Sequence, residues 1–78
     1  MGRSRVILYG RPACHLCDEA RQALGDMGLG FDEINIEDDE GLHAAFLERI
    51  PVVEVDGQVV SELGLDEAAI RAAITWAP

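Results

Sequence analysis

The chain contains no lysine, and its six basic residues, all arginines, face 15 Asp and Glu residues. The formal charge of -9 leaves no basic stripe to neutralise phosphates, so nucleic acid is not an expected partner. No apolar run approaches the roughly 18 residues that a membrane span requires, and residues 1–5 lack the apolar segment of a secretory signal. These absences predict a cytoplasmic protein that binds neither nucleic acid nor membranes.

Cysteine is also scarce, with only Cys14 and Cys17 in the chain. A small secreted domain held together by disulfides normally carries more cysteines at wider spacing. The 78 residues, 49% of them apolar, suffice for one modest core, because a chain of this size buries only about 60% of the surface that it exposes when unfolded. We therefore expect a single monomeric domain over residues 1–78, in which the close cysteine pair serves chemistry.

The first half of the chain predicts a strand, a helix and a second strand. Residues 6–9 form an unbroken apolar run that Gly10 ends, as in a central strand buried on both faces. In residues 16–27 apolar side chains recur at helical spacing, and Gly28 supplies a helix stop. Residues 31–36 alternate polar and apolar side chains, which is typical of an edge strand with one wetter face.

The second half predicts a short helix followed by a hairpin. The acidic run of residues 37–40 precedes a helical pattern over 42–46, and acidic side chains are favourable at the positive N-terminus of a helix. Asp56-Gly57 stands between the valine-rich runs 52–55 and 59–60, which is a strong hairpin signal.

A last helix and the topology complete the expected fold. Asp66 is placed to cap this helix, Trp76 near its end is expected as a packing or rim residue, and its inward positions are Ile70, Ala73, Ile74 and Ala77. The order β-α-β-α-β-β-α and the right-handed crossover rule predict an α/β fold with a four-stranded mixed sheet flanked by helices. Its site is expected beyond the first strand, at residues 10–17.

The Cys-x-x-Cys motif of residues 14–17 falls where this loop becomes helix. Residues three apart on a helix lie about 5–6 Å apart at Cβ, close to what a disulfide spans. The helix N-terminus stabilises a thiolate, and thiols in such motifs have pKa values of roughly 3.5–7.5. Arg11 and a protonated His15 are expected to add to this tuning, whereas the two acidic residues after the motif oppose it. We predict a moderately lowered pKa for Cys14, as in a reductant.

Two other interpretations of the cysteine pair are weaker. In the first interpretation, the two thiols are buried side chains that only contribute to packing. The strand-loop-helix context favours a redox motif instead. In the other, His15 and His43 would complete a zinc site with the cysteines. His15 lies between the cysteines and would strain a tetrahedral site, and His43 falls in a distant helix, so no metal is predicted.

The sequence resembles the glutaredoxin-like branch of the thioredoxin superfamily over residues 6–74. Four segments carry the resemblance: residues 8–13 before the cysteine motif, residues 18–20 after it, residues 50–53 and residues 55–57. It implies a thioredoxin-like fold and a thiol-disulfide oxidoreductase acting in cell redox homeostasis or electron transport. Cys14 would attack a substrate disulfide and Cys17 would resolve it, without an organic cofactor but with glutathione as a possible co-substrate.

The resemblance also implies substrate-binding residues. It makes the Ile50-Pro51 bond cis and places it beside the cysteines, with the backbone of Ile50 presented to a peptide or glutathione. Arg11 matches the cation that glutaredoxins carry near the thiolate. The alternatives are an ordinary trans Pro51 that opens a strand and a solvated loop charge at Arg11. Leu63 stands where glutathione-binding glutaredoxins carry the first glycine of a Gly-Gly turn, and Asp66 serves either the ligand or only as a helix cap.

The expected partners are a disulfide-containing protein or a low-molecular-weight thiol. The electron donor is glutathione, another small thiol or a thioredoxin reductase. Two alternatives stay open: an electron donor to ribonucleotide reductase, which residues 51–57 resemble although the sequence departs after Ser61, and a non-catalytic module that docks a basic partner. Nothing favours a third possibility, an iron-sulfur cluster carried between two chains.

Two further side chains near the expected site allow two interpretations each. Tyr9 is expected as a buried aromatic residue with one hydrogen bond, or else as part of the site lining. Arg49 is placed either to complement a substrate carboxylate next to Pro51 or to screen nearby acidic residues.

Overall fold

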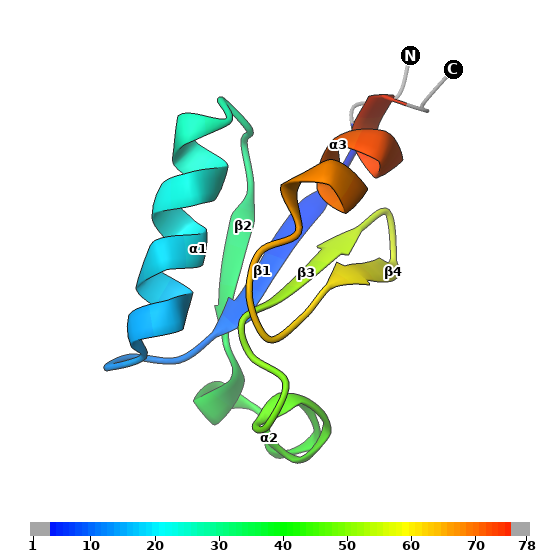
Figure 1. The fold of residues 1–78 in the computed structure, drawn as a ribbon. Helices are drawn as coiled ribbons and strands as arrows, with labels where there is room; N and C mark the ends of the chain where they lie inside the picture. Colours follow the sequence, from blue (N-terminus) through cyan, green and yellow to red (C-terminus); the bar gives the residue numbers. More distant parts are fainter. Residues whose placement is uncertain (1–3, 76–78) are drawn as a thin grey trace.

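A computed structural model of the protein describes residues 4–75, and its ribbon is drawn in Figure 1. The elements follow in the order β1 (Val6–Gly10), α1 (His15–Asp26), β2 (Asp32–Asn35), the 3-10 helix η1 (Ile36–Asp38), α2 (Glu40–Phe46), β3 (Val52–Val55), β4 (Gln58–Ser61) and α3 (Glu67–Thr75). The predicted order is confirmed, with η1 as an addition. Trp76 and Ala77, expected on the last helix, lie outside the described residues.

The four strands form one mixed sheet in the order β2-β1-β3-β4. β1 pairs in parallel with β2 and antiparallel with β3, so the first strand is central and β2 is an edge strand, as expected. The turn between β3 and β4 is Asp56-Gly57, and both residues have the positive φ that a tight hairpin turn requires, +51° and +86°. No helix within residues 4–75 is both long and apolar enough to cross a bilayer.

The sheet contributes to two apolar clusters from its opposite faces. The main core joins strand residues to α1 and α3 and consists of Val6, Leu8, Ala20, Leu24, Val53, Val55 and Ile70. The second, which we call the disulfide cluster, consists of Tyr9, Cys17, Ile36, Ile50 and Val52, with Phe46 and Leu42 of α2 packed against it. In Figure 1, α2 lies beyond the end of the sheet at which β1 stops. The disulfide cluster therefore closes the end of the fold where the site was expected.

The predicted second strand, residues 31–36, is one residue too long at each end, since β2 spans Asp32–Asn35. β2 ends at Asn35, whose Oδ1 accepts the N–H of Glu37 at 2.9 Å and so starts η1. Ile36 belongs to η1, yet its side chain is fully buried on the apolar side that the alternation assigned to it. Asp39 then caps α2 by accepting the N–H of Leu42 at 2.9 Å. Asn35 and Asp39 thus cap two successive helices, because amide and carboxylate oxygens satisfy unpaired backbone donors.

Candidate active site

The two cysteines form a disulfide at the start of α1, and their Cα atoms are 5.2 Å apart. Cys14 is the N-cap residue of this helix, with extended backbone, and its Sγ accepts the N–H of Cys17 at 3.2 Å. Its carbonyl accepts the N–H of Asp18 at 3.0 Å. Sγ of Cys14 therefore occupies the place of a capping oxygen, where helix donors and the helix dipole stabilise negative charge.

The two sulfurs differ in their access to solvent. Cys14 is half-buried, whereas Cys17 has no exposed surface. A Cβ atom on Gly10 would lie 3.1 Å from Sγ of Cys17, so β1 ends in glycine where the helix packs most closely against it. The sequence pattern identified Gly10 only as the end of a strand. Its contact with Cys17 had no signal in the sequence.

The loop before Cys14 contains a second feature that the sequence did not reveal. Ala13 has a φ of +57°, in the left-handed region that residues with a side chain rarely adopt. Such conformations cluster at functional sites when the surrounding structure holds them. Here the conformation lies one residue before the sulfur that caps α1.

The chain around Pro51 packs in the same cluster as the cysteines. The Ile50-Pro51 bond is cis, and Pro51 is fully buried. The Ile50 N–H donates to the carbonyl of Phe46 at 3.0 Å, and the Leu63 N–H donates to the carbonyl of Arg49 at 2.9 Å. Leu63 is 63% exposed and has a φ of +62°, so the loop keeps the backbone conformation that suits glycine while carrying a large apolar side chain.

The loop between β4 and α3 is held by two polar side chains. The Ser61 hydroxyl donates to the carbonyl of Gly64 at 3.0 Å and accepts the N–H of Asp66 at 2.8 Å. Asp66 in turn accepts the N–H of Ala69 at 3.0 Å. The capping role of Asp66 is thus present, and its role toward a ligand stays a prediction.

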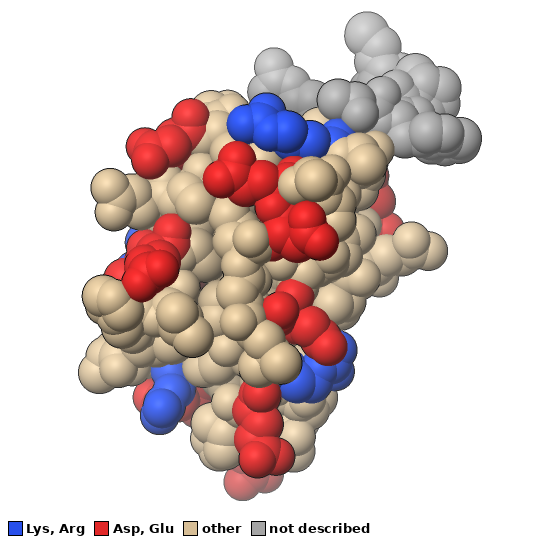
Figure 2. Space-filling view, in the orientation of Figure 1, with Lys and Arg blue, Asp and Glu red and all other residues tan. Residues whose placement is uncertain are grey.

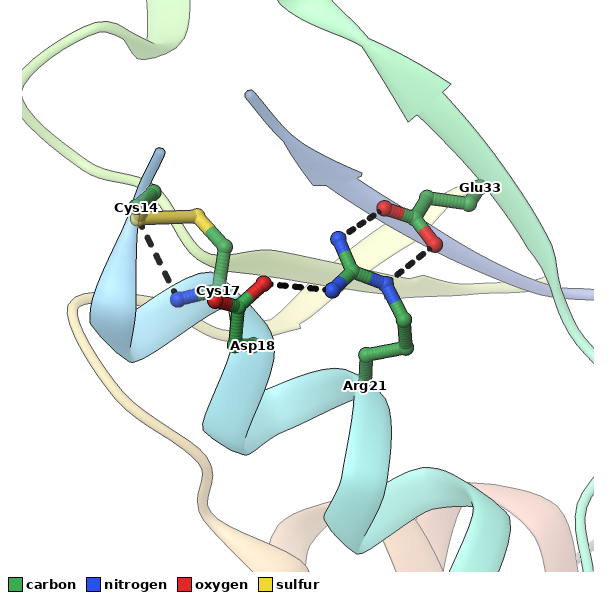
Figure 3. A network of polar contacts seen from close by, with 5 residues as sticks. All are labelled: Cys14, Cys17, Asp18, Arg21 and Glu33. Atoms are coloured by element: carbon green, nitrogen blue, oxygen red, sulfur yellow. Dashed lines mark hydrogen bonds and ion pairs between the residues drawn. A yellow bond between two sulfur atoms is a disulfide. The ribbon is translucent and has the colours of Figure 1, made fainter. Parts of the chain in front are cut away.

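A charged network begins at Asp18, the residue that follows the cysteine motif, and Figure 3 shows its members. Nη1 of Arg21 donates to Oδ1 of Asp18 at 2.6 Å. Nε of Arg21 donates to one oxygen of Glu33 on β2 at 2.7 Å, and its Nη2 bonds to the other oxygen. The hydrogen bonds to Glu33 and then to Asp18 raise the pKa of Arg21 above its ordinary value. The network connects the first turn of α1 to the edge strand.

Both cations that were predicted near the thiolate stand beside carboxylates. Nε2 of His15 lies 2.7 Å from the carboxylate of Glu19, and the His15 side chain is 87% exposed. Nη1 of Arg11 lies 3.9 Å from the carboxylate of Glu37. Acidic side chains form several separate patches on the face seen in Figure 2, and some of these patches have arginine beside them. The tuning role of His15 and the substrate role of Arg11 stay predictions.

Arg49 and Tyr9 line the disulfide cluster from the α2 side. Arg49 bonds to Glu62, and its guanidinium carbon lies 5.2 Å from the centre of the Phe46 ring. The Tyr9 ring lies 5.0 Å from the same ring, and its hydroxyl donates to Glu54 at 3.3 Å. Burial, followed by the charge of Glu54, raises the pKa of Tyr9. The expected single hydrogen bond of a buried Tyr9 is thus present.

An open cleft next to the motif runs between α1 and the β2 end of the sheet, and it is lined by Gly10, Arg11, Pro12, Asp18, Arg21, Glu33 and Asn35. Within residues 4–75, no three His, Cys, Asp or Glu side chains gather as metal ligands would.

Comparison with known proteins gives a consistent picture. Residues 5–75 match the model of the family described as Glutaredoxin-like domain (DUF836). The uncharacterized protein Rv0508 of Mycobacterium tuberculosis is 36% identical over 83 residues, which cover 95% of this chain and 86% of the relative. The solution structure of protein Ne2328 from Nitrosomonas europaea superposes with a TM-score of 0.84 at 26% identity, covering 95% of this chain and 94% of that one.

A more distant structure bears on the fold alone. The crystal structure of a buckwheat glutaredoxin-glutathione complex superposes with a TM-score of 0.70 at 14% identity, covering 92% of this chain and 77% of that one. Together with the sheet order and the helices, this likeness confirms the predicted thioredoxin-like α/β fold.

Proposed function

We propose that this chain, which belongs to the glutaredoxin-like domain family, is a thiol-disulfide oxidoreductase that works through Cys14 and Cys17. The observation that carries the proposal is the asymmetry of the two sulfurs. Cys14 is half-buried and its Sγ caps α1, where a thiolate is stabilised, whereas Cys17 is fully buried and its sulfur lies within bonding distance of that of Cys14. In such a pair, one sulfur attacks the substrate disulfide and the other then resolves the mixed disulfide.

The reaction proceeds in two exchange steps. In the reduced protein the Cys14 thiolate attacks one sulfur of a substrate disulfide, whose S–S bond breaks while the other sulfur leaves as a thiolate. Cys17 then gives up its proton and attacks Sγ of Cys14, and the remaining substrate sulfur leaves and takes up that proton. Two electrons have passed to the substrate. An external thiol returns them by the reverse exchange.

The substrate is proposed to lie over the segment that holds the cis bond. Ile50 and Pro51 lie in and beside the cluster that contains Cys17, and Leu63 is exposed on the loop hydrogen-bonded to Arg49. We expect an apolar segment of a substrate protein, next to its disulfide, to contact these residues, and Arg11 to attract a carboxylate. Glutathione serves in this scheme as co-substrate and no bound organic cofactor is needed. The cytoplasm, with its reduced thiol pool, suits a reductant of this kind.

Redox titration tests the proposal directly. The protein is equilibrated in glutathione buffers of graded potential, quenched with acid, alkylated and analysed by mass spectrometry. We expect a two-electron transition of the cysteine pair within about -180 to -290 mV. Cys14→Ser is expected to abolish disulfide reduction, whereas Cys17→Ser accumulates the mixed disulfide on Cys14. Absence of a disulfide at every potential, or full activity of Cys14→Ser, would leave the chain as a binding module with two thiols.

A further inference from the structure

Asp18 lies where it would oppose a thiolate on Cys14. It is the fourth residue after Cys14, its N–H donates to the Cys14 carbonyl at 3.0 Å, and it lies in the first turn of the helix that Cys14 caps. Two negative charges in this arrangement disfavour each other. An uncompensated Asp18 would therefore raise the pKa of Cys14 and reduce the fraction of reactive thiolate at neutral pH.

Arg21 compensates this carboxylate. Its Nη1 lies 2.6 Å from Oδ1 of Asp18, and Figure 3 shows the Asp18 carboxylate turned toward the guanidinium. The other edge of the guanidinium is occupied by both oxygens of Glu33, which comes from β2 and not from the helix. A guanidinium held on two sides has a fixed orientation, and its third nitrogen, Nη1, faces Asp18.

We propose that Arg21 is a positioning residue that keeps Cys14 reactive by neutralising Asp18, while Glu33 fixes the guanidinium in place. The inference rests on the proposed redox function and deepens it, since Arg21 acts through Asp18 and not on the substrate. The other charged groups around the start of α1 are already paired with one another: Arg11 with Glu37 of η1, His15 with Glu19 of α1 and Arg49 with Glu62 of the loop beside Ile50.

The pH dependence of Cys14 alkylation tests this role. The reduced full chain is treated with iodoacetamide, an uncharged probe, between pH 5 and 9, and the Cys14 product is quantified by mass spectrometry. Below the Cys14 pKa we expect Arg21→Gln to react about two- to fivefold more slowly than the wild type, with the midpoint of the curve moved to higher pH. Arg71→Gln is the matched control, because it removes the same charge from an exposed pair with Glu67 on α3.

Two further variants separate charge from packing. Arg21→Lys keeps the positive charge and is expected to retain most of the wild-type rate. Asp18→Asn, added to Arg21→Gln, removes the uncompensated carboxylate and is expected to restore the rate. A merely structural role for Arg21 would show the opposite pattern, because the double variant lacks both side chains of the ion pair.

The possible outcomes are distinct. If Arg21→Gln matches Arg71→Gln, or if the double variant stays as slow as Arg21→Gln, the inference is wrong while the redox function stands. If Cys14 of the wild type titrates near the value of a free thiol, about 8.5, the proposed function itself fails. Should Arg21→Gln not fold, Asp18→Asn alone decides: it must react at least as fast as the wild type, and slower reaction overturns the proposal.

Discussion

The main core and the disulfide cluster both contain residues of β1 and β3, but they differ in the kinds of side chain that they contain. Leu8 and Val53 face the main core, whose members are all aliphatic. Their neighbours Tyr9 and Val52 face the disulfide cluster, which also contains Cys17 and a phenol. Because successive strand residues point to opposite faces, the same two strands contribute to both clusters, and of the two only the disulfide cluster contains a buried cysteine. The comparison predicts that changes in the two clusters destabilise alike and affect the redox chemistry differently.

Substitution of two adjacent valines on β3 is expected to have the largest effect on stability, and it tests this difference. Val52 and Val53 are both fully buried, and they belong to opposite clusters. Truncation of either to Ala is expected to lower the free energy of unfolding by about 2–3 kcal/mol, because two methyl groups are lost and a cavity remains. A domain of this size has about 4–12 kcal/mol in total, so both variants should fold.

The redox measurement then distinguishes the two valines. We expect the potential of the cysteine pair to shift in Val52→Ala, which loosens the cluster around Cys17, and to stay at the wild-type value in Val53→Ala. Urea unfolding and the glutathione titration are made on the same preparations. Equal shifts in both variants would mean that the two clusters behave as one core.

Gly10 gives the second test, because it bounds the disulfide cluster from β1. A Cβ atom on Gly10 would lie 3.1 Å from Sγ and 3.2 Å from Cβ of Cys17. We expect Gly10→Ala to cost about 2 kcal/mol by overpacking and to cost more in the oxidised protein, where the disulfide restrains Cys17. Gly25→Ala is the control: nothing lies within 4 Å of that Cβ, and Ala in a helix is expected to gain up to about 1 kcal/mol. Equal unfolding midpoints for the two variants would contradict the close packing.

Local patterns predicted the elements and the cap at Asp66. The alternation around Ile34, the turn at Asp56-Gly57 and the cap at Asp66 each depend on residues close in sequence, and the structure contains them. Ile36 shows the limit, because its buried side chain fits a strand, while the Asn35 cap that turns the backbone into η1 competes with that pattern.

The environment of the cysteines was less accessible to sequence reasoning. Arg21 and Glu33 are 12 residues apart and lie on different elements, and in a chain with 15 acidic residues no local signal marks Glu33 as the partner. Leu63 adopts a left-handed backbone conformation, which sequence reasoning expects only where a glycine stands at the position itself. The cis bond before Pro51 followed from the family resemblance and not from the residues themselves, since most such bonds are trans.

The smallest expected effect concerns the phenol of the disulfide cluster. Burial and then the charge of Glu54 raise the pKa of Tyr9 above the ordinary tyrosine value of 10.0. The folded state therefore holds the phenol proton more tightly than the unfolded state does. The stabilisation is fully present below pH 10 and is lost as the pH rises through the folded-state pKa. The main core contains no titrating group, so it contributes no such dependence.

In this chain few groups other than Tyr9 titrate at alkaline pH, so the pH dependence of the free energy of unfolding can be assigned to this tyrosine. It has one tyrosine and no lysine, its arginines stay charged, and the oxidised cysteines do not titrate. We expect Tyr9→Phe to be about 1 kcal/mol less stable than the wild type in urea unfolding at pH 9, through loss of the hydrogen bond to Glu54, and this gap to narrow by pH 11. Glu54→Gln, which keeps an acceptor but removes the charge, should make the narrowing smaller, because the folded-state pKa of Tyr9 then lies closer to its unfolded-state value. A gap that stays constant across this range would mean that the phenol ionises in the folded protein as it does in water, and hence that the disulfide cluster is open to solvent at Tyr9.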